Sequence, residues 1–229
     1  MLREGMHKLI TWVDPKGDRA FFDNGEFPWT EKIEADWALI RAELDALLSA
    51  RSGIPNFQDL SPDQKALTEG DQWKTFVLCV YGNEVPENCV RCPETTRLLR
   101  QIPGMKTGLF SILAPGKHIP EHCGPYKGVL RYHLGLLIPP GGGCRIRVRD
   151  DVRFWEEGKS LVFDDSHPHE AWNDSPSLRA VLFVDFVRPL MFPFSAMNRL
   201  MIRRLSGRPF FKEIAQKARE FGRRPVESE

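Results

Sequence analysis

Five of the six histidines in this chain lie between residues 117 and 170, within sequence that favours β-strands. They are His118, His122, His133, His167 and His169. A neutral imidazole is the commonest metal ligand in proteins, so this local excess predicts a metal site. His118 and His122 have the i, i+4 spacing of helical zinc motifs, but Pro120 lies between them and no helical sequence flanks them. The pattern therefore disfavours a zinc hydrolase.

Cationic side chains accompany these histidines. In the run 129–138, apolar residues alternate with a second face that presents Arg131 and His133. A guanidinium beside an imidazole suits a carboxylate ligand, although an ordinary exposed sheet face would give the same pattern.

Arg179 and Ser111 are polar residues set into apolar strand sequence. A buried arginine requires an anionic partner, so Asp185, another protein carboxylate or a ligand carboxylate is expected beside Arg179. For Ser111 taken alone, a hydrogen bond to the backbone is favoured over contact with a ligand.

The elements that must position these residues are mostly strands. A buried strand is expected at 73–81, and five further β-type runs are separated by Pro, Gly and Asp turns: 107–113, 129–138, 145–148, 161–163 and 178–187. This spacing predicts a mainly β fold, an antiparallel sandwich, barrel or jelly roll of the class that includes cupins.

Helical patterns flank the strands. Apolar residues recur at helical spacing over 30–48, with Thr30 as the expected N-cap, and a short helix is expected from Pro93. Residues 49–72 have the composition of a long loop, and residues 190–229 are basic and amphipathic. We expect one domain over 1–229, divided into N-terminal helices and a first strand (28–104), a β core (105–189) and a C-terminal tail (190–229).

Composition excludes several classes of function. The formal net charge of the 229 residues is +1, which gives no reason to expect nucleic acid as a partner. No apolar run is long enough to span a membrane and the first residues lack a signal-peptide core, so a cytoplasmic protein is expected. Five cysteines, an odd number, favour reduced thiols, and the pair Cys89 and Cys92 lacks the second pair of a zinc ribbon.

Five segments together resemble the aspartyl/asparaginyl β-hydroxylase family, whose members are Fe(II)- and 2-oxoglutarate-dependent oxygenases on a double-stranded β-helix. The segments are SILAPG at 111–116, HCGP at 122–125, LRYHLGL at 130–136, WEEGK at 155–159 and FDDS followed by HEAW within 163–172. The resemblance covers about residues 73–189. It implies a cupin-like jelly roll with flanking helices and a dioxygenase that uses Fe(II), 2-oxoglutarate and O2.

The resemblance also implies a role for each candidate residue. His122 and His169 resemble the iron ligands. Arg131, counted with them among the catalytic residues, and His133 resemble partners of the C1 end of 2-oxoglutarate. Arg179 and Ser111 resemble the residues that hold its C5 carboxylate, and Trp73 resembles the tryptophan beside it. His118 and His167 match no ligand position.

One departure concerns the third iron ligand. Non-haem iron sites of this kind usually combine two histidines with a carboxylate, but the chain has Gly124 two residues after His122. The animal members share this glycine, which implies that water fills the position. Cys123 is disfavoured as a ligand because adjacent strand residues point to opposite faces.

The substrate is left open by the sequence. The glycine and the 163–172 segment favour hydroxylation of the β-carbon of Asp or Asn in a peptide or protein, whereas residues 187–189 and the tail resemble the lipid A and ornithine-lipid hydroxylases. The tail could lie on the inner face of a membrane as a peripheral contact or pack on the sheet. A non-catalytic cupin-like binding module is the remote alternative, and the paired arginines speak against it.

Overall fold

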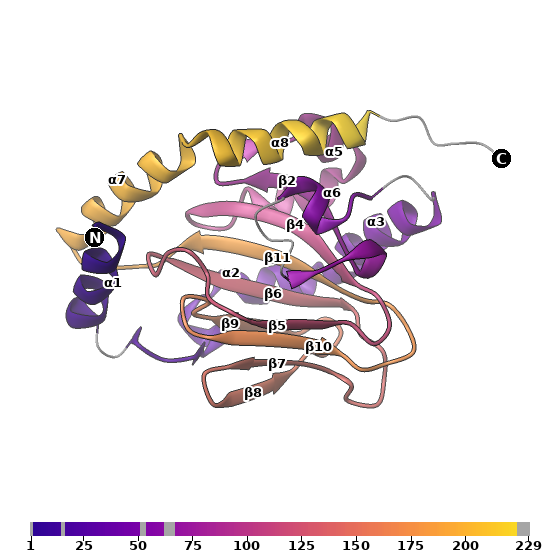
Figure 1. Cartoon of the computed structure of the whole chain (residues 1–229), viewed down its shortest axis with the longest axis horizontal. Coiled ribbons are helices and arrows are strands. Elements are labelled where there is room, and N and C mark those ends of the chain that lie inside the picture. Colours follow the sequence, from indigo (N-terminus) through magenta and orange to yellow (C-terminus); the bar gives the residue numbers. More distant parts are fainter. Residues whose placement is uncertain (1, 15–16, 51–53, 62–66, 224–229) are drawn as a thin grey trace.

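Two antiparallel sheets face each other in this computed structural model, which describes residues 2–14, 17–50, 54–61 and 67–223 (Figure 1). The seven-stranded sheet has the order β1-β9-β6-β11-β4-β2-β3, and the four-stranded sheet has the order β5-β10-β7-β8. The strands of the larger sheet are β1 (Phe21–Phe22), β2 (Trp73–Val80), β3 (Asn83–Glu84), β4 (Met105–Leu113), β6 (Val129–Leu137), β9 (Ser160–Phe163) and β11 (Arg179–Val187). Those of the smaller sheet are β5 (His118–His122), β7 (Cys144–Val148), β8 (Asp151–Phe154) and β10 (His169–Asn173). This is the cupin-like sandwich that the strand pattern predicts.

The two faces of the larger sheet have different partners. Along β6, Leu130, Tyr132 and Leu134 belong to a core that the N-terminal helices cover. The intervening residues face the smaller sheet, whose Ile146 and Ala171 pack in the interior between the sheets. The predicted division of this strand is therefore confirmed, and Arg131 and His133 lie on the interior face.

The helix predicted over 30–48 is two helices, α2 (Trp29–Ala35) and α3 (Trp37–Ser49). The chain leaves helical geometry at Asp36, whose short carboxylate side chain disfavours a helix interior. Pro28 holds the N-cap position, and the hydroxyl of Thr30 instead donates to the carbonyl of Phe27 at 2.9 Å. The expectations of one helix and of a Thr30 cap were wrong.

The structure contains further helices around the two sheets. They are α1 (Leu2–Val13), η2 (Asn24–Glu26), α4 (Phe57–Leu60), η4 (Gly70–Gln72), α5 (Pro86–Arg91), α6 (Pro93–Leu99), α7 (Phe194–Ser206) and α8 (Pro209–Gly222). The helix at Pro93 is confirmed, and α4 and η4 interrupt the loop expected over 49–72, of which 51–53 and 62–66 lie outside the described residues. All five cysteines are free, as expected.

The C-terminal tail is two helices with different supports. Helix α8 packs on the larger sheet, where Ala215 and Ala218 join Val77 and Leu109 in one apolar cluster. Helices α7 and α8 follow one another along one side of the molecule, and α7 packs beside α1 (Figure 1). Among the described residues, no helix has the length and apolar character required to cross a membrane.

Candidate active site

His122 and His169 lie side by side on neighbouring strands. They are direct cross-strand partners in the pairing of β5 with β10, and their ring centroids are 4.2 Å apart. His122 ends β5 and His169 begins β10, so both rings lie at one end of the smaller sheet. The structure thus brings together the two histidines that the sequence assigns to a metal.

Backbone carbonyls determine which nitrogen of each ring is available. Nδ1 of His122 lies 2.8 Å from the carbonyl of Pro120, and Nδ1 of His169 lies 2.9 Å from the carbonyl of His167. Since a carbonyl only accepts, each Nδ1 carries the proton and each Nε2 keeps its lone pair. Burial lowers the pKa of both rings, that of His169 to about 3, so both imidazoles are neutral near pH 7. Two neutral imidazoles with free Nε2 atoms are donors that suit a divalent transition metal.

Gly124 allows a carboxylate to approach this end of the sheet. The amide N–H of Gly124 donates to the backbone carbonyl of Asp165 at 2.6 Å. A Cβ at position 124 would overlap the carboxylate of Asp165, which is fully buried. Burial raises the pKa of this carboxyl to about 7, against the opposing charge of Arg131. The absence of a side chain at 124 therefore gives Asp165 its space.

Arg131 is held by protein carboxylates. Its guanidinium lies 2.8 Å from Asp165 and 2.8 Å from Asp185, and it covers the ring of Phe183 at 4.1 Å. Asp185, considered from the sequence as a partner of Arg179, pairs with Arg131 instead. The proposed contact of Arg131 with a co-substrate stays a prediction, because two carboxylates already neutralise this cation.

Arg179 is a deeply buried cation whose charge no carboxylate of the described residues balances. Its side chain is 1% exposed and lies over the ring of Trp155 at 3.8 Å, and within the described residues it forms no ion pair. Burial lowers its pKa to about 9. A buried guanidinium without a counterion is costly in the interior of a protein, so the geometry here fits an anionic ligand.

Further polar atoms around Arg179 have no partner in the described part of the chain. They are Nε of Arg179, Nε1 of Trp155 and both ring nitrogens of His133. His133 lies among aromatic rings, 5.0 Å from Phe163 by ring centroids, and burial lowers its pKa well below 6.5. Phe163 in turn lies 6.3 Å from the ring of His169. The unpartnered donors and the histidine pair therefore belong to one interior region.

Trp73 and Ser111 are bonded to each other. Nε1 of Trp73 donates to Oγ of Ser111 at 3.0 Å, and Phe57 stacks on the indole at 4.0 Å. This bond leaves the hydroxyl proton of Ser111 free to be donated. Ser111 is the cross-strand partner of Val181, two residues beyond Arg179, so the hydroxyl and the guanidinium lie on adjacent strands.

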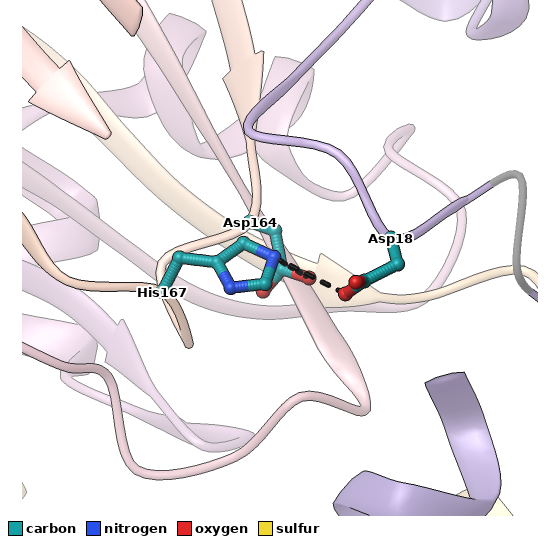
Figure 2. A group of neighbouring side chains, drawn as sticks. All are labelled: Asp18, Asp164 and His167. Atoms are coloured by element: carbon teal, nitrogen blue, oxygen red, sulfur yellow. Dashed lines mark ion pairs between the residues drawn. The ribbon is translucent and has the colours of Figure 1, made fainter. Parts of the chain in front are cut away.

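The remaining two histidines of the cluster lie elsewhere. His118 stacks on Trp172 and pairs with Glu170 on the outer face of the smaller sheet. His167 forms a second group of ligand types with Asp18 and Asp164 (Figure 2). The ammonium of Lys127 lies among the same atoms, 2.8 Å from each of the two carboxylates, and so takes the position of a cation.

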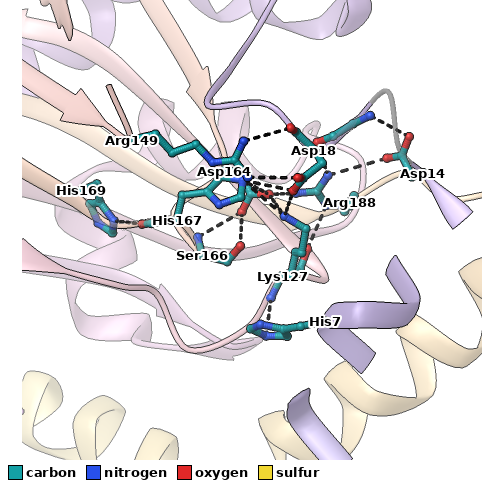
Figure 3. Close-up of polar contacts among 11 residues, drawn as sticks. His7, Asp14, Asp18, Lys127, Arg149, Asp164, Ser166, His167, His169 and Arg188 are labelled. Carbon is teal, nitrogen blue, oxygen red and sulfur yellow. Dashed lines mark hydrogen bonds and ion pairs between the residues drawn. The ribbon is translucent and has the colours of Figure 1, made fainter. Parts of the chain in front are cut away.

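An ion-pair network surrounds this second group (Figure 3). Arg188 contacts Asp164 and donates to the carbonyl of Lys127 at 2.8 Å, while Arg149 pairs with Asp18 at 3.0 Å. Burial lowers the pKa of His167 to about 4, so this ring is neutral. The network holds the turn before β10 in place. The carbonyl of His167, in this turn, accepts the hydrogen bond from Nδ1 of His169.

A cavity of about 610 Å³ reaches Cys123, the residue that follows His122, although neither ligand candidate, His122 or His169, is part of its lining. Arg131, Asp165 and Cys123 line its polar end, and α8 closes its apolar part against the larger sheet. The apolar lining includes Val77, Leu109, Phe183, Leu205, Phe211 and Ile214. The cavity was not foreseen from the sequence, because its walls come from seven separate helices and strands.

Comparison with known proteins assigns the family. The sequence profile of the family described as aspartyl/asparaginyl beta-hydroxylase matches residues 34–189, more than half of the chain. The chain belongs to the aspartyl/asparaginyl β-hydroxylase family. It is accordingly an enzyme of a hydroxylase family, as the resemblance of its motifs implies.

Two relatives in this β-hydroxylase family differ in the substrates that their names state. The chain is 46% identical over 198 residues to the ornithine lipid ester-linked acyl 2-hydroxylase of Rhizobium tropici, covering 86% of this chain and 70% of the relative. It is 36% identical over 191 residues to the human aspartyl/asparaginyl beta-hydroxylase, covering 81% of this chain and 24% of the relative. The chain thus spans about a quarter of the length of the human protein.

Solved structures of cupins are less similar to this chain than these two relatives are. A cupin 2 conserved barrel domain protein from Salinispora arenicola matches 61% of this chain and 92% of its own at 11% identity and a TM-score of 0.34. The Cupin_2 domain of an XRE family transcriptional regulator from Enterobacter cloacae matches 36% and 82% at 18% identity and a TM-score of 0.31.

Proposed function

We propose that the chain is an Fe(II)- and 2-oxoglutarate-dependent hydroxylase. The observation that carries the proposal is the buried, uncompensated Arg179 in the interior that the histidine pair adjoins. A dicarboxylate such as 2-oxoglutarate would supply the missing negative charge, with the guanidinium as a bidentate donor and the Ser111 hydroxyl as a further donor. The unpartnered nitrogens of His133 and Trp155 add donors to the same region.

The chain's own residues would hold and orient the reacting groups. His122 and His169 would bind the metal through Nε2, and the carbonyls of Pro120 and His167 keep each ring turned for that contact. When bound, iron and 2-oxoglutarate supply the oxidising power to hydroxylate an unactivated C–H bond. The aromatic rings of Trp155 and Phe163 would exclude water from the co-substrate.

The test is spectroscopic and requires no substrate. Anaerobic addition of Fe(II) and then 2-oxoglutarate should give a weak metal-to-ligand charge-transfer band in the visible, and His169→Ala should lose it. His118→Ala removes an imidazole from the outer face of the same sheet and should keep the band. A band retained in His169→Ala would reject the ligand assignment, and none in the unaltered chain at saturating ligand would reject the cofactor assignment.

For the substrate, the cavity supports an acyl chain. Its apolar walls extend from Arg131 and Asp165 to α8, and they have room for an extended hydrocarbon. The ester-linked acyl 2-hydroxylase named among the relatives acts on a group of this kind. A lipid acyl chain is therefore our first candidate substrate, ahead of the peptide that the sequence motifs favour.

The β-carbon of Asp or Asn in a peptide is the second candidate. It is supported by the similarity to the human aspartyl/asparaginyl beta-hydroxylase and by the glycine at position 124. Mass spectrometry of lipids and peptides after incubation with the enzyme would separate the two, because hydroxylation adds one oxygen to the product. Oxygen gained only by peptides would overturn the acyl assignment while leaving the cofactor assignment intact.

A cavity-filling variant tests whether the acyl chain of the substrate would lie in this cavity. Ile214→Trp places a larger ring among the apolar walls, so turnover of long acyl chains should fall several-fold relative to short ones. Val90→Trp, at an exposed valine on α5, is the matched control. An unchanged chain-length preference in Ile214→Trp would exclude the cavity as the acyl site.

A further inference from the structure

Large apolar side chains project into solvent at and before helix α7. Met191 and Phe192 are each 83% exposed, Leu200 is 51% exposed and Met197 is 44% exposed. We call these four residues the α7 face. They lie close together in sequence, whereas exposed single apolar residues scattered over a surface require no explanation.

The α7 face is held outward by contacts on the opposite side of the helix. Asn198 is fully buried, accepts a hydrogen bond from the hydroxyl of Tyr126 at 2.8 Å and donates to the carbonyl of Gly128 at 2.8 Å. Ile202 is buried against α1. At about 100° per residue, Leu200 points away from both Asn198 and Ile202. Burying Leu200 in the chain's own core would therefore require breaking these contacts.

The surroundings of the α7 face are positively charged. Arg199, Arg203, Arg204 and Arg208 are all exposed, and residues 190–208 contain no acidic residue. In the described part of the chain, none of the four arginines forms an ion pair. On the helical wheel, Arg203 and Arg204 flank Leu200 on its two sides. Trp12, 73% exposed on the neighbouring helix α1, adds an aromatic ring at the same end of the molecule (Figure 1).

We propose that the α7 face docks on the surface of an anionic phospholipid bilayer. Apolar and aromatic side chains would enter the interface while the arginines contact lipid phosphates. A second copy of the chain fits less well, since a symmetric contact would bring the arginines of both copies together. The proposal goes beyond the proposed function, because docking requires neither metal nor co-substrate.

Docking at this face would place the cavity close to the lipid. Leu205, in the last turn of α7, and Arg208, just after it, line the cavity described above. The segment that carries the α7 face therefore also forms part of the cavity wall. An acyl chain drawn from the bilayer would have a short path to that wall.

The experiment is co-sedimentation of the full chain with vesicles of phosphatidylcholine alone or mixed with phosphatidylglycerol. Binding is expected only to the anionic vesicles and should weaken as salt is raised. Arg203→Glu combined with Arg204→Glu should weaken it at least about tenfold, since each basic residue near such a surface contributes about fivefold. Phe192→Ser should weaken it several-fold.

The matched controls lie on β8, in the other sheet. Phe154→Ser removes an exposed ring and Arg153→Glu reverses an exposed charge, and both should bind like the unaltered chain. The proposal is overturned by no binding to anionic vesicles, by equal losses in the controls, or by a dimer that Phe192→Ser dissociates. Activity is measured separately, so a failure of docking leaves the proposed reaction untouched.

Discussion

At the scale of single residues, Gly124, two residues along the chain from His122, leaves space for a buried carboxylate. A Cβ at this position would overlap the carboxylate of Asp165. Gly124→Ala should therefore displace Asp165 and weaken its ion pair with Arg131, and metal affinity should fall by about tenfold. Titration with Co(II) measures the change. The double variant with Asp165→Ala should add little further loss, and full additivity would contradict the steric explanation.

Arg179 gives the second prediction at this scale. Arg179→Leu removes a fully buried guanidinium that has no counterion in the described residues, so 2-oxoglutarate should bind about 30-fold to 1000-fold more weakly, a few kcal/mol. The free enzyme should lose little stability, because an uncompensated buried charge disappears. Arg145→Leu, at a partly exposed arginine of β7, is the control. An unchanged affinity of Arg179→Leu for 2-oxoglutarate would show that the co-substrate binds at another place.

At the scale of elements, α8 closes the cavity, and a stacked ring pair adds to the apolar contacts between this helix and the sheet. Phe211 stacks on Tyr81 with ring centroids 3.9 Å apart. Phe211→Ala should cost about 1–3 kcal/mol of unfolding free energy and speed hydrogen exchange in α8. Phe154→Ala, at an exposed ring, should change neither. Exchange in α8 that stays as slow as in the unaltered chain would show that other contacts hold the helix.

Strands β2, β4, β6, β9 and β11 of the larger sheet were predicted from the sequence, whereas β5 and β10, which carry His122 and His169, were not. Apolar alternation located β4, β6, β9 and β11 to within two residues at each end. Strand β5 contains Pro120 and lies at a sheet edge, where proline is tolerated, so its sequence lacks the usual strand signal. The pairing of His122 with His169 follows from sheet register, which no local pattern specifies. Their selection rested on the resemblance to a family.

At the scale of the whole molecule, the ion-pair network around Asp164 joins segments that are distant in the sequence. Asp18, Lys127, Arg149 and Arg188 come from four different places along the chain, so charge patterning could not predict it. The sequence placed His167 outside the ligand set, and the structure explains its position, since its ring lies 3.4 Å from Asp18 and 3.5 Å from Asp164.

This network predicts how stability changes with pH. Burial holds the pKa of His167 at about 4 in the folded chain against 6.5 in the unfolded chain. Between these values only the unfolded chain takes up the proton, so the unfolding free energy should fall as pH drops from 6.5 to 4, by up to about 1.4 kcal/mol per pH unit. Chemical denaturation of the metal-free protein measures the slope. His167→Gln should reduce the slope by the share of this one ring, and an equal slope would assign the whole effect to other groups.

The cross-strand position of the two histidines has a consequence for aggregation. Strand β5 is an edge strand that pairs with β10 alone, and His122 and His169 sit opposite each other at the end of that pair. A metal bound by both rings would fasten the edge strand to its neighbour. Without it, β5 should fray and expose the backbone hydrogen-bonding groups of β10 to other molecules. Prolonged chelation should therefore increase light scattering at constant protein concentration, and restoring the metal early should prevent it.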